Sequence, residues 1–130
     1  MNAKIALLIP CYNEENCVER MISDIVQELP EAFLVIVNDG SSDNSWEVIK
    51  HLRAQDEHVR GICFRRNYGK SAALHCGFDL VEGDVVITMD ADLQDSPDEI
   101  PELYRMIIEE GYDLVSGWKK KRFDPAGKRL

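Results

Sequence analysis

Residues 33–55 read FLVIVNDGSSDNSWEVIKHLRAQ, and this stretch decides the fold class. Phe33 to Asn38 is a short, mostly aliphatic run that predicts a buried strand, and Ser45 to Gln55 follows as a predicted helix. The serine, aspartate and asparagine residues just before Ser45 are typical of a helix start. The polar turn Asp39-Gly40-Ser41-Ser42 therefore joins the end of a buried strand to a helix.

The same strand-then-helix unit recurs on both sides of this stretch. Further strands are predicted at residues 4–9, 59–64, 84–90 and 112–118, and further helices at 18–29, 71–81 and 96–108. The last helix starts with the capping box Ser96-Pro97-Asp98-Glu99. Five strands alternating with four helices predict an α/β fold, with a mainly parallel sheet, right-handed crossovers and helices on both faces.

Length and composition favour one globular domain or part of one. The chain has 130 residues, 45% of them hydrophobic and 30% charged, which excludes a disordered tail. No apolar stretch approaches the roughly 20 residues that span a bilayer, so we expect a cytoplasmic location for these residues. The four cysteines form no C-x-x-C pair, which predicts reduced and mostly buried thiols.

Charge is distributed unevenly along the chain. The formal net charge is −9, but residues 119–130 hold six basic side chains and one acidic, which leaves residues 1–118 at −14. A body that acidic is a poor nucleic-acid binder. The basic tail is either a solvated terminal run or a contact to anionic lipid or a phosphorylated ligand.

Polar residues gather where the predicted strands end, which is where open α/β sheets bind ligands. Asp90 and Asp92 flank one small residue at the end of an apolar strand, so both carboxylates can approach one point. A divalent cation would remove their repulsion, and hard oxygen ligands that include the Gln94 carbonyl suit Mg²⁺ or Mn²⁺. A solvated acidic turn is the alternative interpretation.

Three more strand-end residues have two interpretations each. Asp39 either accepts a hydrogen bond from a base or ribose, with Asp43 capping the helix, or is itself the cap. Glu14 either contacts bound nucleotide or answers the helix dipole. Lys70, in Gly69-Lys70-Ser71, either contacts phosphate at a helix start or lies in a solvent-facing loop. A P-loop is out of register, since it would need glycine at Phe64.

Four motifs, in order and at strand ends, resemble the donor-binding part of inverting family 2 glycosyltransferases with the Rossmann-like GT-A fold. They are residues 9–15 (IPCYNEE), 37–43 (VNDGSSD), 66–74 (RNYGKSAAL) and 89–97 (MDADLQDSP). The last motif is most similar to that of polyprenyl-phosphate sugar transferases that use dolichyl or undecaprenyl phosphate. The resemblance implies that residues 1–118 are the donor domain and that the 119–130 tail leads to an acceptor region lying beyond this sequence.

The resemblance also assigns roles to residues. It implies a nucleotide-sugar site formed by Pro10, Tyr12, Glu14, Asp39, Lys70, Asp90, Ala91 and Asp92. It implies a Mg²⁺ or Mn²⁺ ion bridging the diphosphate and held by Asp90, Asp92 and Gln94. Many relatives have Gly-x-Arg after the fifth strand, where this chain has Gly117-Trp118-Lys119, so Lys119 and Arg122 are the candidates for the acceptor phosphate.

The function that this resemblance implies is inverting transfer of a sugar from UDP or GDP to an acceptor, here a polyprenyl phosphate. No catalytic base is evident, and an ionised lipid phosphate would not need one. We expect the sequence to be the front part of a longer enzyme that acts at the cytoplasmic face of a membrane. Two alternatives remain open: a P-loop-like nucleotide-binding module using Gly69-Lys70-Ser71, and a non-catalytic domain that binds membrane surfaces through its basic tail.

Overall fold

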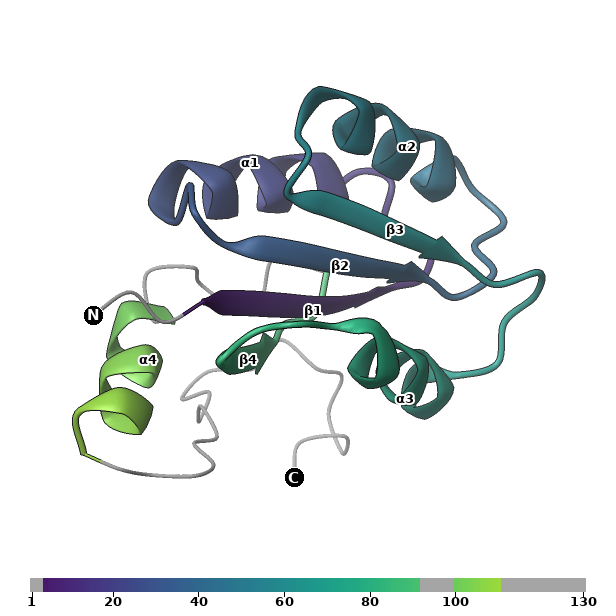
Figure 1. The fold of residues 1–130 in the computed structure, drawn as a ribbon. Coiled ribbons are helices and arrows are strands. Elements are labelled where there is room, and N and C mark those ends of the chain that lie inside the picture. The colour runs from purple at the N-terminus through teal and green to yellow at the C-terminus, as the bar shows by residue number, and fades with distance from the viewer. Residues whose placement is uncertain (1–3, 92–99, 111–130) are drawn as a thin grey trace, which may run out of the picture. The chain divides into compact units, whose positions relative to one another are not determined.

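A computed structural model of the protein describes residues 4–91 and 100–110. Within these residues the strands form a four-stranded, fully parallel sheet in the order β3-β2-β1-β4 (Figure 1). The strands are β1 (Ile5–Cys11), β2 (Phe33–Asn38), β3 (Val59–Cys63) and β4 (Val85–Thr88). The register places Leu8 beside Val35 of β2 and Thr88 of β4. The predicted parallel α/β fold is confirmed.

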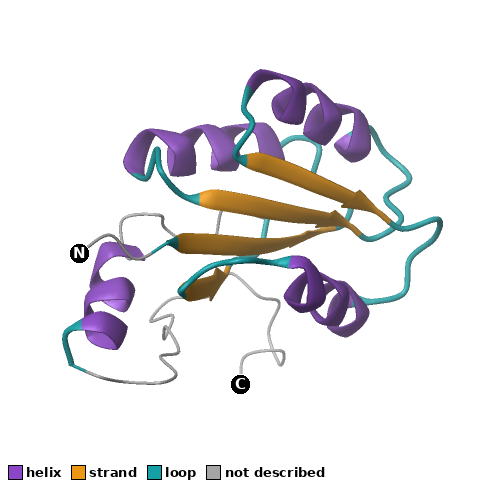
Figure 2. Ribbon diagram, viewed as in Figure 1, coloured by secondary structure: helices purple, strands orange, loops and turns teal. Residues whose placement is uncertain are grey.

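In the part of the chain that the structure describes, three helices of the first unit cover the two faces of the sheet. Helices α1 (Val18–Glu28) and α2 (Ser45–Gln55) lie on one face, and α3 (Lys70–Leu80) lies on the other (Figure 1). Helix α1 buries the stripe Val18, Met21, Ile22 and Ile25, as its spacing predicts. Figure 2 shows the loops that leave the carboxyl ends of the strands.

Helix α3 packs close to the sheet because its contact residues are small. Ala73 is fully buried in one cluster with Leu8, Val35 and Val37. A Cβ atom on Gly77 would lie 2.1 Å from Leu8 Cδ1, so only glycine fits there without movement. Small residues at these positions of the sequence predict close packing on a sheet, and the structure confirms it for Ala73 and Gly77.

Two sequence expectations are wrong in detail. The spacing of Ala73, Cys76, Gly77 and Leu80 predicts one packed stripe on α3, but Leu80 is 54% exposed and Val81 packs against the core cluster in its place. The reason is spacing, since Val81 continues the four-residue steps from Ala73 and Gly77. Strand β4 ends at Thr88 and is shorter than the predicted run to Asp90.

Helix α4 (Ile100–Ile108) belongs to a second compact unit. Within it, the Arg105 guanidinium bonds Glu102 at 2.6 Å and Glu110 at 3.1 Å. The structure confirms the predicted helix over these residues, whereas the capping box at 96–99 and the predicted strand at 112–118 lie outside the described residues. No helix in the described ranges is long and apolar enough to cross a membrane.

Candidate functional site

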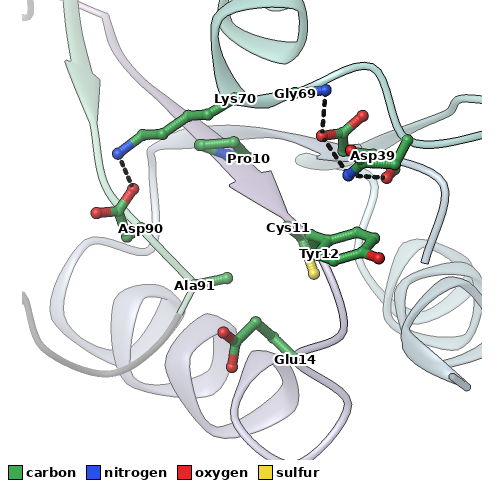
Figure 3. A pocket seen from close by; sticks show the side chains of 10 residues that line it. Pro10, Cys11, Tyr12, Glu14, Asp39, Gly69, Lys70, Asp90 and Ala91 are labelled. Atoms are coloured by element: carbon green, nitrogen blue, oxygen red, sulfur yellow. Dashed lines mark hydrogen bonds and ion pairs between the residues drawn. The ribbon is translucent and has the colours of Figure 1, made fainter. Parts of the chain in front are cut away.

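The strand order creates a crevice between β1 and β4. The chain runs outward from β1 to β2 and β3, then returns across the opposite face to form β4 on the other side of β1. The order of the strands along the sheet therefore reverses between β1 and β4, and ligands of such sheets bind at this point. A cavity of about 340 Å³ lies there, lined by Pro10, Cys11, Tyr12, Glu14, Asp39, Asn67, Gly69, Lys70, Asp90 and Ala91 (Figure 3).

The cavity brings together seven of the eight residues predicted to bind a nucleotide sugar. They are Pro10, Tyr12, Glu14, Asp39, Lys70, Asp90 and Ala91, and they come from the carboxyl ends of β1, β2 and β4 and the start of α3. Asp92 and Gln94, predicted as metal ligands, and Lys119 and Arg122, predicted for the acceptor phosphate, lie outside the described residues. The volume is at the lower end of the range for small-molecule sites.

The turn after β1 is tied to the turn after β2 by hydrogen bonds between side chains and backbone. The N–H groups of residues 13, 14 and 15 donate to Ser41 Oγ, Ser45 Oγ and Asp43 Oδ2 at 2.9, 2.9 and 3.2 Å. In return, Asn13 Oδ1 accepts the N–H of Ser42 at 2.8 Å. These bonds fix the backbone that carries Tyr12 and Glu14 into the cavity wall.

Two conformational details support this arrangement. Asn13 has a φ of 53°, a left-handed conformation that asparagine adopts more readily than most residues. Asp43 Oδ1 accepts the N–H of Ser45, the first residue of α2, but Asp43 lies one residue before the N-cap position, so the prediction that it is the cap is wrong by one residue. The N-cap position itself is Asn44, whose side chain makes no capping bond.

Asp39 is 3% exposed and is held by the loop before α3. Its Oδ1 accepts the N–H of Tyr68 at 2.8 Å, and its Oδ2 accepts the N–H of Gly69 and Asn67 Nδ2, both at 3.0 Å. Asp39 is therefore no Asx-turn cap of α2, since its carboxylate bonds residues some 30 positions later in the chain. The Asp39 side chain is thus fixed at the cavity wall.

Gly40 allows the β2 and β3 loops to come this close. Its φ is 65°, and a Cβ atom there would lie 2.1 Å from the Arg66 carbonyl carbon and 2.3 Å from the Asn67 nitrogen. Any side chain at position 40 would push residues 66–67 away. Asp39 thus supplies the hydrogen-bond acceptor, and Gly40 leaves the space that the donors of residues 67–69 need to reach it.

An ion pair crosses the opposite part of the cavity. Lys70 Nζ lies 2.7 Å from Asp90 Oδ1, and the two side chains are 60% and 33% exposed (Figure 3). Lys70 begins α3 and Asp90 follows β4, so the pair links the start of α3 to the segment after β4. Because both groups remain accessible, a phosphorylated ligand can meet an ammonium group and a carboxylate at one place.

Cys11 is the one cysteine that the structure buries. Burial raises the pKa of its thiol to about 11. A hydrogen bond with Ser45 lowers the pKa, but by less than burial raises it. The expectation of mostly buried thiols is wrong for Cys63, which is exposed at the end of edge strand β3, while Cys17 and Cys76 are half-buried. All four are free thiols, as predicted.

Sequence reasoning missed three cavity residues, Cys11, Asn67 and Gly69. Asn67 is the only amide side chain in the loop between β3 and α3, which is the one local signal that it had a bonding role. Its partner is Asp39, 28 positions earlier, and no local pattern connects the two.

The described residues supply one of the three predicted metal ligands. Asp90 presents a carboxylate oxygen at the cavity, which is the donor type that Mg²⁺ and Mn²⁺ prefer. Within residues 4–91 and 100–110, no group of three or more His, Cys, Asp or Glu residues could hold a metal ion. Asp90 thus fits the predicted metal, and a complete site would need ligands from beyond residue 91.

Residues 6–129 match the family model described as Glycosyl transferase family 2. The chain belongs to glycosyl transferase family 2. Undecaprenyl-phosphate 4-deoxy-4-formamido-L-arabinose transferase of Proteus mirabilis is 44% identical over 126 residues, and the protein of the same name from Photorhabdus laumondii is 42% identical. Each alignment covers 93% of this chain and 38% of the relative, so the chain spans about two fifths of the curated relatives.

Solved glycosyltransferases share the fold. A mannosyltransferase from Pyrobaculum calidifontis in complex with GDP-Man and Mn²⁺ superposes with a TM-score of 0.71 at 18% identity, covering 83% of this chain and 33% of that one. Glucosyl-3-phosphoglycerate synthase from Mycobacterium tuberculosis, in complex with Mn²⁺, UDP and phosphoglyceric acid, gives 0.65 at 23% identity, covering 82% and 39%. The GT-A fold expected for this family is confirmed.

Proposed function

We propose that the chain is the donor-binding part of a glycosyltransferase that moves a sugar from a nucleoside diphosphate to a polyprenyl phosphate. The observation that carries the proposal is that one cavity gathers seven predicted donor-site residues. Family membership and the names of the two bacterial relatives support the reaction class and the acceptor class.

The two ends of the cavity suit the two ends of a nucleoside diphosphate. Asp39 offers an acceptor for N–H or O–H groups of the nucleoside, and Tyr12, 48% exposed, offers an aromatic face. Lys70 and Asp90 lie toward the other side (Figure 3), where the lysine would contact phosphate and the aspartate a cation. Mg²⁺ or Mn²⁺, when bound, would neutralise charge on the departing diphosphate.

The proposed transfer forms one bond and breaks one. A phosphate oxygen of the acceptor attacks the anomeric carbon, and the bond from that carbon to the diphosphate oxygen breaks with inversion. The electron pair leaves with the nucleoside diphosphate. The acceptor phosphate is already ionised near pH 7, so no side chain has to remove a proton from it.

The P-loop alternative finds no support in the contacts of this loop. In a P-loop, backbone N–H groups of the glycine-rich segment cradle phosphate. Here the N–H groups of Tyr68 and Gly69 donate to the Asp39 carboxylate, so they are already occupied. An anionic phosphate in their place would also have to approach that carboxylate.

Calorimetric titration with UDP and with GDP, each with and without Mn²⁺, tests the proposal. We expect metal-dependent binding of one nucleotide, weakened about tenfold or more by Lys70→Ala and by Asp92→Ala. Lys50→Ala is the matched control, because Lys50 also forms an exposed ion pair, 3.1 Å from Glu47, but on α2 and not in the cavity wall. Absence of binding by the folded protein would refute the proposal.

The acceptor class needs a separate assay with the full-length protein. Sugar transfer to undecaprenyl phosphate, and none to undecaprenol, is expected because the attacking atom is a phosphate oxygen. Equal transfer to both lipids would refute the lipid-phosphate part while leaving donor binding intact.

A further inference from the structure

Three hydrogen-bond donors from one short loop converge on a single buried carboxylate. Asn67 Nδ2, Tyr68 N–H and Gly69 N–H all donate to Asp39, at 3.0, 2.8 and 3.0 Å. Two of them are backbone groups that every residue type but proline supplies. Asn67 is the only one of the three whose donor is a side chain, and therefore the only one that depends on residue identity.

The Asn67 amide makes two contacts with Asp39. Its Nδ2 donates to the backbone oxygen at 3.1 Å and to carboxylate Oδ2 at 3.0 Å, so it links the main chain and the side chain of one residue. This double contact fixes the rotation of the carboxylate relative to its own backbone. The side chain of Asn67 also lines the cavity.

The two carboxylate oxygens are used unequally by the described residues. Oδ2 accepts two hydrogen bonds, whereas Oδ1 accepts one, from Tyr68. A carboxylate oxygen has two lone pairs, so Oδ1 keeps capacity for a further donor. An acceptor held rigid before binding loses less conformational freedom when the ligand arrives.

We propose that Asn67 is a positioning residue that fixes the Asp39 carboxylate so that Oδ1 accepts a hydrogen bond from the nucleoside of the donor. This inference rests on the proposed function, because it needs a nucleoside in the cavity. It gives Asn67 a role in recognising the nucleoside end, and none at the diphosphate end near Lys70 and Asp90 (Figure 3).

The first test compares ligands that contain a nucleoside with one that lacks it. Calorimetry with UDP and GDP, and with inorganic pyrophosphate, all in Mn²⁺, is run on the wild type and on Asn67→Ala. We expect nucleotide affinity to fall about tenfold, the effect of one hydrogen bond to a charged group, with pyrophosphate affinity changed less than twofold. A merely structural role would weaken all of these ligands together.

The second test uses Asn67→Asp, which replaces the donor with a second carboxylate about 3 Å from the first. Two carboxylates this close cannot both ionise easily, and a shared proton would restore the contact at low pH. Nucleotide affinity relative to wild type should therefore fall about a hundredfold at pH 8 and recover toward pH 5. The other titratable cavity groups are unchanged in the variant and cancel in the ratio: Cys11, Tyr12, Glu14, Lys70 and Asp90.

Arg65→Ala is the matched control for both variants. It changes the net charge by the same single unit as Asn67→Asp, on the same loop, at an exposed position outside the cavity wall. We expect its nucleotide affinity to stay within about twofold of wild type. Melting temperatures identify any variant that fails to fold. If Asn67→Ala does not fold, Asn67→Ser replaces it, and the ratio of its nucleotide affinity to its pyrophosphate affinity tests the role of Asn67.

The binding results distinguish the role of Asn67 from the proposed function. Nucleotide-selective weakening in Asn67→Ala, with recovery of Asn67→Asp at low pH, supports the inference. Wild-type affinity in Asn67→Ala, or equal weakening for pyrophosphate, overturns it while the proposed function stands. Failure of the wild type to bind any nucleotide would refute the proposed function itself.

Discussion

Replacing Gly77 by alanine should change the stability of the fold in a direction that depends on Leu8. The added Cβ would lie 2.1 Å from Leu8 Cδ1 and 3.0 Å from Leu8 Cγ and Cδ2. Carbon atoms pack at about 3.5–4.0 Å, so helix α3 or the leucine would have to move by about 1.5 Å. Leu8 is fully buried between β2 and β4 and has little room to move.

Two opposing terms set the size of the effect. Overpacking a close-packed core destabilises the fold by about 1–3 kcal/mol, whereas alanine in place of glycine inside a helix stabilises it by about 1 kcal/mol. We therefore expect Gly77→Ala to lower the free energy of unfolding by up to about 2 kcal/mol. In the background of Leu8→Ala the clash is gone, and the same substitution should raise the free energy of unfolding by about 1 kcal/mol.

Urea denaturation followed by circular dichroism measures all four proteins of this double-mutant cycle. Leu7→Ala is the matched control background, because neighbouring strand residues point to opposite faces and Leu7 faces away from α3. There Gly77→Ala should remain destabilising. Gly77→Ala with the same sign and size in the wild-type and Leu8→Ala backgrounds would refute the reasoning. Displacement of α3 should also weaken nucleotide binding, because Lys70 begins this helix.

Three further predictions concern the loops and the thiols of the site. Gly40→Ala should lower the free energy of unfolding by about 3 kcal/mol and weaken UDP binding, since its Cβ would lie 2.1 Å from the Arg66 backbone. Urea denaturation measures the first effect and calorimetry the second. Asn13→Ala should lower the free energy of unfolding by about 1–2 kcal/mol, whereas Asn13→Asp should lower it by under about 0.5 kcal/mol, because Asn13 Oδ1 serves only as an acceptor. Equal losses for the two variants in urea denaturation would contradict this. In timed alkylation at pH 8 read by peptide mass spectrometry, exposed Cys63 should react before Cys11. With a pKa of about 11, only about one Cys11 thiol in a thousand is ionised at pH 8, and its rate should rise with pH.

The local parts of the fold follow from the sequence. The bounds of β2 and α2 match the prediction to the residue, because a short apolar run and a polar cluster mark both elements within the stretch itself. Errors occur where tertiary contacts decide. Leu80 and Val81 are both apolar neighbours at the end of α3, and only the four-residue steps from Gly77 put Val81 against the core.

The candidate site was predictable in its position and less so in its bonding. Asp39 and Asp90 both end apolar runs, and parallel strands bring such ends to one edge, so their gathering follows from topology. The bonds from residues 13–15 to the serines and aspartate of the next turn join positions about 30 apart. Serine and aspartate at a turn can equally well bond to their own turn. Sequence alone therefore does not show whether these side chains bond locally or to a distant turn.

Pro10 explains why the cavity opens where it does. The Leu8 carbonyl accepts the N–H of Met89 on the β4 side, and the Cys11 carbonyl accepts the N–H of Asp39 on the β2 side. Alternate residues of a parallel strand bond to opposite neighbours, so residue 10 bonds, like residue 8, toward β4. Proline has no N–H to donate, and the pairing of β1 with β4 accordingly stops at Leu8 and Thr88, while pairing with β2 continues to Cys11. A single proline thus separates Asp90 and Ala91 from β1 and leaves the space that becomes the ligand cavity.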